Sequence, residues 1–373
     1  MKIFLDEGRG CSLNYLNYYF KRELLSKHYN ITADPSDADI LIFPKNCCCT
    51  FYDMVKTFSH IEVVLAQKKD TAQTLLIGCL TREFNSPVNS CIDDWISRNI
   101  DFVFPQNSPE LLLKHISQQS FASLEKDFGF YIHDDKSAAV YISNGCQNNC
   151  SFCKLTFQKY PLSSANFEKV LYFIDQIDDK KLPSLFLKGT NICQFGLDNY
   201  STHKLPELLE YIDAKENIKN VSLVGFSFKD AIKNNFQDVL ANSKKNYTLC
   251  GSLESGSDRI LELMRKGFTS QEIIDFVNSI RKSNDIGLYL NIIAGFPTEN
   301  IDDIKQTLYV LNEMRAPEVN ICRYTNSLFV DSNQFRQLSA EQIHDSARCY
   351  KKVLTQRGVK AHIRGFGYSL ENS

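Results

Sequence analysis

The chain has 373 residues, of which 43% are hydrophobic and 23% are charged, and its formal net charge is −2; this length predicts two domains, and this charge gives no global attraction to nucleic acid. No apolar run approaches the roughly 18 residues of a membrane span, and the N-terminus lacks the apolar core of a signal peptide. Thirteen cysteines in a chain without an export signal therefore indicate a cytoplasmic, reducing compartment and metal ligation rather than disulfides.

The first 120 residues alternate between short apolar strands and amphipathic helices. Apolar periodicity predicts strands at 3–5, 40–43, 74–77 and 102–104, and helices at 13–28, 52–66, 92–98 and 109–118. This alternation predicts a small parallel sheet with helices on its faces, a Rossmann-like α/β domain over residues 1–120. The polar, irregular stretch 121–136 is predicted to be a linker or hairpin between domains.

Residues 137–373 continue the alternation. The pattern predicts strands at 138–142, 184–187, 221–224, 247–251, 287–293 and 318–323, and helices at 167–177, 205–214, 231–241, 270–283, 301–312 and 340–356. Six βα units in a row predict a partial (β/α)6 barrel, whose active face lies at the carboxyl ends of its strands.

Three cysteines follow the predicted strand at 138–142. Cys146, Cys150 and Cys153 are spaced by four and three residues, and random scatter of the cysteines would produce this spacing about 0.016 times in the chain. Three thiolates leave one iron of a [4Fe–4S] cluster open for a small molecule, which indicates chemistry at the cluster. A structural zinc site is the alternative, but zinc usually takes four ligands and no second cysteine pair lies nearby.

Other cysteines follow predicted strands of the N-terminal domain. Cys11 comes after the first strand, Cys47, Cys48 and Cys49 after the second, and Cys79 after the third. Ligand sites in open α/β sheets gather at the carboxyl ends of strands, so these positions predict a second metal site at one edge of the sheet. Buried, inert cysteine is the alternative.

Several segments together resemble one protein family. The cysteine motif, with Phe152 before its last cysteine, resembles the signature of radical S-adenosylmethionine (SAM) enzymes. The segments 187–198, 254–269 and 292–299 resemble those of one branch, the methylthiotransferases that modify tRNA or a ribosomal protein. The resemblance covers roughly residues 1–360.

The resemblance implies SAM and two [4Fe–4S] clusters as cofactors. Cys146, Cys150 and Cys153 would hold the cluster that binds SAM and cleaves it to methionine and a 5′-deoxyadenosyl radical. That radical removes hydrogen from an unactivated C–H bond, and the protein supplies orientation and electrostatics.

The family's auxiliary cluster corresponds to Cys11, Cys47 and Cys79. The assignment of Cys47 rather than Cys48 or Cys49 is an alignment choice. In the family this cluster holds the added sulfur, so the resemblance implies conversion of C–H to C–S–CH3.

Five residues are expected to contact SAM. Glu254 and Ser255 end a predicted barrel strand and are expected to bind the ribose or methionyl group, although the family carries Gln where Glu254 stands. Gly295 would let the backbone approach the adenine, and Phe152 and Tyr324 are expected to face the cofactor. For Glu254 and Ser255 the alternative is a capped strand–helix turn.

Two departures from the family bear on the substrate. Family members end in a small β-barrel that grips the substrate, whereas little chain follows the last predicted helix here. The family's arginine-rich stretch after the cluster is replaced by residues 158–164, which weakens the expected affinity for phosphates. We therefore expect a peptide, protein or small-molecule substrate rather than tRNA, no membrane partner, and a monomer that receives electrons from a flavodoxin or ferredoxin.

Three alternatives remain open at this stage. They are a tRNA methylthiotransferase, a radical SAM enzyme of another reaction type with a repurposed N-terminal domain, and a non-catalytic Fe–S or zinc-binding module. The target carbon, and whether the product is a methylthio group, a thiol or a thioether, are also open.

Overall fold

The structure is a computed structural model that describes residues 1–6, 15–45, 51–78, 95–96, 98–104, 109–117, 130–132, 134–153, 162–282, 286–325 and 330–364. The chain divides into two compact units, residues 1–129 and 130–373. Strand β6 (Phe130–Ile132) pairs antiparallel with β7 (Ser137–Asn144). Part of the stretch predicted as a linker or hairpin is therefore a strand of the second unit.

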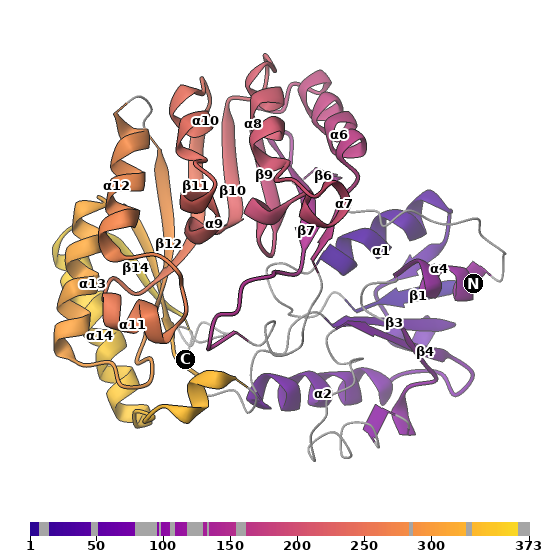
Figure 1. Cartoon of the computed structure of the whole chain (residues 1–373). Helices are drawn as coiled ribbons and strands as arrows, with labels where there is room; N and C mark the ends of the chain where they lie inside the picture. The colour runs from indigo at the N-terminus through magenta and orange to yellow at the C-terminus, as the bar shows by residue number, and fades with distance from the viewer. Residues whose placement is uncertain are drawn as a thin grey trace. The chain divides into compact units, whose positions relative to one another are not determined.

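The first unit is a parallel sheet of five strands in the order β2–β1–β3–β4–β5. Its elements are β1 (Lys2–Leu5), α1 (Tyr15–Ser26), β2 (Asn30–Thr32), η1 (Pro35–Asp37), β3 (Ile40–Lys45), α2 (Phe51–Leu65), β4 (Gln73–Gly78), β5 (Phe102–Phe104) and α4 (Pro109–Ser117). Leu41 and Phe43 of β3 join Ile61 and Val64 of α2 in one buried core, and α1 lies on the opposite face of the sheet from α2 (Figure 1). The predicted parallel α/β class is confirmed.

The second unit is a sheet of nine strands in the order β14–β13–β12–β11–β10–β9–β7–β6, with the short β8 beside β7. Strands β7 to β14 of this path run parallel. The added strands are β8 (Ser163–Ser164), β9 (Ser184–Gly189), β10 (Asn220–Phe226), β11 (Asn246–Glu254), β12 (Gly287–Ala294), β13 (Glu318–Arg323) and β14 (Lys360–Arg364). Within the described residues the two ends of the sheet do not pair with each other. The sheet is therefore open, which agrees with the predicted partial barrel.

Helices form the outer layer of the second unit (Figure 1). They are α6 (Phe167–Asp179), α7 (Leu197–Tyr200), α8 (Leu205–Asp213), α9 (Phe228–Lys233), α10 (Gln237–Asn242), α11 (Asp258–Leu263), α12 (Ser270–Arg281), α13 (Ile301–Glu313) and α14 (Ala340–Gln356), with short 3₁₀ turns η3 (Ile192–Gln194) and η4 (Asp331–Gln334). Capping boxes begin α12, α13 and α14, because the side chains of Thr269, Asn300 and Ser339 accept from the first-turn backbone. None of the described helices is long and apolar enough to cross a membrane.

Burial largely alternates along β9 to β12, as expected for strands covered by helices on one face. In β9, Leu185 and Leu187 are buried under the helices, whereas Phe186 and Lys188 are partly exposed. Because successive side chains of a strand point to opposite faces, the second face of this sheet carries the partly exposed set. This face is free of the helices of the outer layer and leads to the carboxyl edge of the strands.

The structure differs from the predicted elements at several places. The helix predicted at 231–241 is two helices, α9 and α10, separated at Asn235, whose φ of 53° is left-handed. Asparagine tolerates this conformation better than most residues. Strands β2 and β14 and helix α11 were not predicted, and β14 extends the sheet beyond the last predicted helix.

Candidate functional site

The loop that carries the three cysteines leaves the carboxyl end of β7. The strand ends at Asn144, and Gly145, with a φ of 83°, turns the chain into the loop. The thiols of Cys146, Cys150 and Cys153 are partly exposed. The Cys153 N–H donates to the Cys150 carbonyl at 3.1 Å, which closes the last turn of the loop.

Five polar side chains pack beside the first half of this loop, and we call them the polar network: Asn148, Asn191, Gln194, Ser227 and Asp230. The Asp230 carboxylate lies at its centre. It accepts hydrogen bonds from Asn148 Nδ2 at 2.9 Å, Asn191 Nδ2 at 2.8 Å, Gln194 Nε2 at 3.2 Å and Ser227 Oγ at 2.6 Å. The network therefore joins the loop to η3 and to α9.

The polar network reaches one of the cysteine sulfurs. Asn191 Nδ2 and the Asn148 backbone N–H donate to Cys146 Sγ at 3.3 and 3.4 Å. Burial would by itself raise the pKa of Asp230, but its hydrogen bonds from the four neutral side chains lower that pKa below its ordinary value. Asp230 is thus a stable anion beside the loop, whereas burial raises the pKa of the Cys146 thiol.

The second half of the loop is held by apolar contacts and backbone hydrogen bonds. We call the surrounding side chains the apolar cluster: Ile260, Met264, Ile293, Phe296 and Tyr324, with Phe152, Leu263 and Phe335 packed against them. Ser151 donates from its N–H to the Met264 carbonyl at 3.1 Å and from its Oγ to the Leu263 carbonyl at 2.7 Å. Its own carbonyl accepts from Ser332 N–H at 2.9 Å.

Glu254 and Ser255, expected to contact SAM, lie where β11 turns toward α11. Glu254 has a φ of 68°, a conformation that costs free energy in a residue with a side chain. Its carboxylate is buried and lies 3.9 Å from Lys266 Nζ. Burial raises the pKa of Glu254, although the positive charge of Lys266 opposes this shift. Ser255 Oγ is 3.2 Å from Thr307 Oγ1 and accepts from Ser257 N–H at 3.2 Å. These bonds occupy the Ser255 hydroxyl in the turn, and its contact with SAM stays a prediction.

The other three expected SAM residues belong to the apolar side of the loop. A Cβ on Gly295 would lie 2.7 Å from the Ile343 side chain, so close packing against α14 requires glycine here. Tyr324 is buried and its hydroxyl is 2.9 Å from Ser332 Oγ. Phe152 packs edge-on against Phe296, with ring centroids 6.4 Å apart. Their contacts with SAM also stay predictions.

The donor chemistry of the loop fits an iron–sulfur cluster. In the part of the chain that the structure describes, no three His, Cys, Asp or Glu side chains are already gathered around a metal position. The loop nevertheless offers three thiols in one short segment, and N–H groups that donate to a sulfur are a known means of tuning such clusters. Asn191 Oδ1 is buried without a hydrogen-bond partner, which leaves an acceptor beside the loop for a bound molecule.

The predicted auxiliary ligands Cys11, Cys47 and Cys79 lie outside the described residues. The structure therefore neither gathers nor separates them. Their role as a second cluster site stays a prediction.

Comparison with known proteins shows which enzymes the chain is similar to. Residues 140–310 match the Radical SAM superfamily. This stretch of the second unit is a radical SAM domain. It is also 25% identical over 343 residues to a ribosomal protein uS12 methylthiotransferase, RimO, of Clostridioides difficile, covering 87% of this chain and 75% of the relative. It is 21% identical over 386 residues to the tRNA-2-methylthio-N(6)-dimethylallyladenosine synthase of Helicobacter pylori, covering 97% and 86%.

The fold of this radical SAM enzyme also recurs in a solved structure. The radical SAM methyltransferase TsrM of Kitasatospora setae superposes with a TM-score of 0.57 at 11% identity, over 86% of this chain and 72% of that one. The similarity to methylthiotransferases expected from the motifs is confirmed by the two relatives. The radical SAM match implies one [4Fe–4S] cluster and SAM.

The polar network includes the residues that the sequence did not reveal. Asn191 and Gln194 lie in the segment 187–198 that resembles the family, but no role was predicted for them. Ser227 and Asp230 form the spacing Ser-x-x-Asp, which signals a helix start, and Ser227 does cap α9. The same two residues also hold the cysteine loop, which the capping pattern does not indicate.

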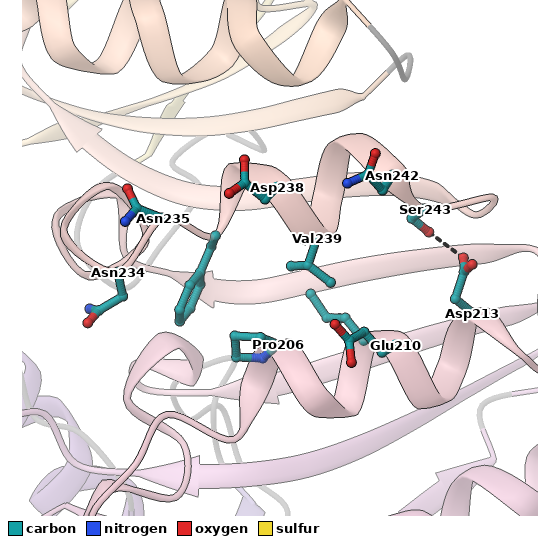
Figure 2. A pocket seen from close by; sticks show the side chains of 11 residues that line it. Pro206, Glu210, Asp213, Asn234, Asn235, Asp238, Val239, Asn242 and Ser243 are labelled. Carbon is teal, nitrogen blue, oxygen red and sulfur yellow. Dashed lines mark hydrogen bonds between the residues drawn. The ribbon is translucent and has the colours of Figure 1, made fainter.

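A pocket of about 410 Å³ lies away from this site, between α8 and α10 (Figure 2). Acidic and amide side chains border it, among them Glu210, Asp213 and Asp238, over an apolar floor that includes Phe236. Asp213 already accepts from Ser243 Oγ at 2.5 Å and from Lys244 N–H at 2.7 Å. The pocket belongs to the outer helical layer, and we assign it no part in the chemistry.

Proposed function

We propose that this protein is a radical SAM methylthiotransferase that converts C–H to C–S–CH3 on a peptide, a protein or a small molecule. The observation that carries this proposal is the extent of the similarity to methylthiotransferases. It spans 87% and 97% of the chain, whereas the radical SAM match covers residues 140–310. Sulfur transfer needs a second part beside the radical SAM domain, and the similarity includes the N-terminal unit.

The chain's own residues prepare the site for radical formation. A [4Fe–4S] cluster on Cys146, Cys150 and Cys153 would supply the electron that cleaves SAM to methionine and a 5′-deoxyadenosyl radical. Asp230 orients Asn148 and Asn191 toward Cys146. The apolar cluster around Phe152 keeps water from the other half of the loop.

We further propose that Cys11, Cys47 and Cys79 hold an auxiliary cluster that supplies the sulfur. A flavodoxin or ferredoxin would deliver the electrons, and the enzyme would act as a monomer. The acidic balance of the chain, with 44 Asp and Glu against 42 Lys and Arg, favours a peptide, protein or small molecule over tRNA. A tRNA substrate, as named for the Helicobacter pylori relative, is the alternative within the same reaction.

A radical SAM enzyme of another reaction type is the second candidate. The fold similarity to TsrM, a radical SAM methyltransferase, favours it. The mass of the product separates the two candidates, because methylthiolation adds about 46 Da and methylation about 14 Da to the substrate.

Iron analysis and SAM cleavage test the proposal together. After anaerobic reconstitution the wild type is expected to hold about eight irons, and a Cys11→Ala, Cys47→Ala, Cys79→Ala variant about four. That variant is expected to keep cleaving SAM on reduction with dithionite, since its radical SAM loop is intact.

The matched control removes the other three cysteines. A Cys146→Ala, Cys150→Ala, Cys153→Ala variant is expected to lose SAM cleavage while it keeps about four irons. A wild type with about four irons, unchanged when Cys11, Cys47 and Cys79 are replaced, would refute the auxiliary cluster and leave the second candidate.

A further inference from the structure

The helix-free face of the second unit's sheet carries a row of polar side chains in register. Tyr141 of β7 pairs with Lys188 of β9, and the row continues through Val224 to Cys250 and, across β12, to Glu318. Residues paired in register point to the same face of a sheet. Leu187, next to Lys188, is fully buried under the helices, so Lys188 lies on the other face.

Lys188 is a partly buried ammonium group beside two aromatic rings. Its Nζ lies 5.7 Å from the centre of the Tyr141 ring and 5.6 Å from that of Phe186. Burial lowers its pKa, with only the Cys250 thiol opposing the shift. No hydrogen bond or ion pair satisfies this ammonium group among the described residues.

Three other lysines of the described part of the chain also lie beside aromatic rings, but each of them has an anionic partner. Lys204 lies over Phe167 and pairs with Glu207, and Lys215 lies over Tyr211 and pairs with Asp175. Lys266 lies over Phe268 with Glu254 at 3.9 Å. Each of these three cations has a carboxylate partner within the protein. Lys188 lies beside aromatic rings in the same way but has no carboxylate partner among the residues that the structure describes.

Lys188 lies near the strand end that leads into the cysteine loop. Its register partner Tyr141 precedes Asn144, the last residue of β7, by three residues, which is about 10 Å along a strand. The cysteine loop begins directly after Asn144. A molecule held at Lys188 on this face would therefore extend toward the loop where the radical is formed.

We propose that Lys188 binds a carboxylate group of the substrate, an assignment that rests on the proposed function for the identity of the bound molecule. One ammonium between two rings matches a monoanion, since phosphate sites usually gather several donors or an arginine fork. The substrate class is thus a peptide or small molecule that carries a carboxylate.

Nuclear magnetic resonance of the full chain with ¹³Cε-labelled lysine tests this site directly. The Lys188 signal is assigned by its loss in Lys188→Arg, and the Lys204 signal by its loss in Lys204→Arg. At pH 7 and constant ionic strength the protein is titrated with sodium acetate, sodium phosphate and acetamide. A ligand as small as acetate binds weakly, so the titration extends into the tens of millimolar.

Acetate is expected to shift the Lys188 signal saturably. The Lys204 signal is expected not to shift, because the Lys204 ammonium is already paired with Glu207. Acetamide is expected to move neither. The proposal is overturned if acetate does not move the Lys188 signal, if acetamide moves it equally, or if phosphate saturates it at lower concentration than acetate does.

A second measurement separates the substrate from the cofactor, because SAM also carries a carboxylate. Equilibrium dialysis of the reconstituted enzyme is expected to give Lys188→Met the SAM affinity of the wild type, whereas a loss of about tenfold would assign Lys188 to SAM and overturn the proposal. The acetate titration needs neither cluster nor sulfur transfer. Failure of the methylthiotransferase reaction and failure of the carboxylate site are therefore distinguishable.

Discussion

The two halves of the cysteine loop are held by different kinds of interaction. Cys146 to Asn148 is fastened by the polar network, in which one buried anion, Asp230, accepts four hydrogen bonds. Ser151 to Cys153 is fastened by backbone hydrogen bonds and by the apolar cluster around Phe296. A directional network fixes the orientation of individual donors near a sulfur, whereas apolar packing fixes position and excludes water.

Two buried carboxylates, Asp230 and Glu299, differ in the direction in which their pKa values are shifted. Asp230 has donors enough to keep its charge, and its pKa is lowered. Glu299 accepts hydrogen bonds from Gly295 N–H at 2.7 Å and from Tyr350 Oη at 3.0 Å. Its pKa is raised to about 7, chiefly by burial. The two carboxyls therefore have pKa values shifted in opposite directions, because hydrogen bonds outweigh burial at Asp230 and burial outweighs hydrogen bonds at Glu299.

Removal of Asp230 is expected to have a large effect on the stability of the protein and on the cysteine loop. Asp230→Ala leaves four donors, two of them buried, without their acceptor, and we expect a loss of roughly 3 kcal/mol in the free energy of unfolding. The loop should also retain less iron, and the electron paramagnetic resonance spectrum of the reduced cluster should change. Urea unfolding, iron analysis and that spectrum measure these effects.

The matched control for Asp230 is a carboxylate remote from the loop. Asp213 also accepts two hydrogen bonds, from Ser243 and Lys244, but it belongs to the outer helical layer. Asp213→Ala is expected to lower stability and to leave the cluster spectrum unchanged. If both variants alter the spectrum equally, the polar network has no specific role at the loop.

Glu299 should make stability depend on pH in the opposite sense to an ordinary carboxylate. Its pKa rises from 4.5 to about 7 in the folded protein, so between these values the folded state binds more protons than the unfolded state. Stability from this group is present below the unfolded pKa and is lost as pH rises through 7, by about 3 kcal/mol. Glu299→Gln resembles the protonated acid and should gain that amount relative to wild type between pH 4.5 and pH 8.

Urea unfolding at the two pH values measures this gain. Glu210→Gln, an exposed carboxylate on α8, serves as the control and should leave the pH dependence of wild type unchanged. A difference between Glu299→Gln and wild type that stays constant across this range would contradict a raised pKa at Glu299.

Local patterns made much of the fold and the loop predictable. Cys146, Cys150 and Cys153 lie within eight residues, so their spacing alone placed them in one loop at a strand end. Strand β14, with the sequence Lys-Ala-His-Ile-Arg, has little apolar signal of its own, and it is a strand because it pairs with β13. The break between α9 and α10 depends on the left-handed Asn235, which apolar periodicity does not detect.

The polar network could not be predicted because its contacts are distant in sequence. Asn148 and Asp230 are 82 residues apart, and Asn191 and Asp230 are 39 apart. Each residue alone has an ordinary local explanation, such as the helix cap at Ser227. Only the parallel order of β7, β9 and β10 brings the following segments to one edge of the sheet.

Substitution of Tyr324 should have the smallest effect on stability, and it tests how the apolar cluster holds the second half of the cysteine loop. Its hydroxyl bonds Ser332 Oγ at 2.9 Å while its ring packs on Phe296, so Tyr324→Phe should cost about 1 kcal/mol of stability. SAM affinity should stay within about twofold of wild type, because the hydroxyl is occupied within the protein. Adding Ser332→Ala should cost little more, since both variants remove the same hydrogen bond. If Tyr324→Phe instead weakens SAM binding at unchanged stability, the tyrosine hydroxyl serves the cofactor rather than the packing of the loop.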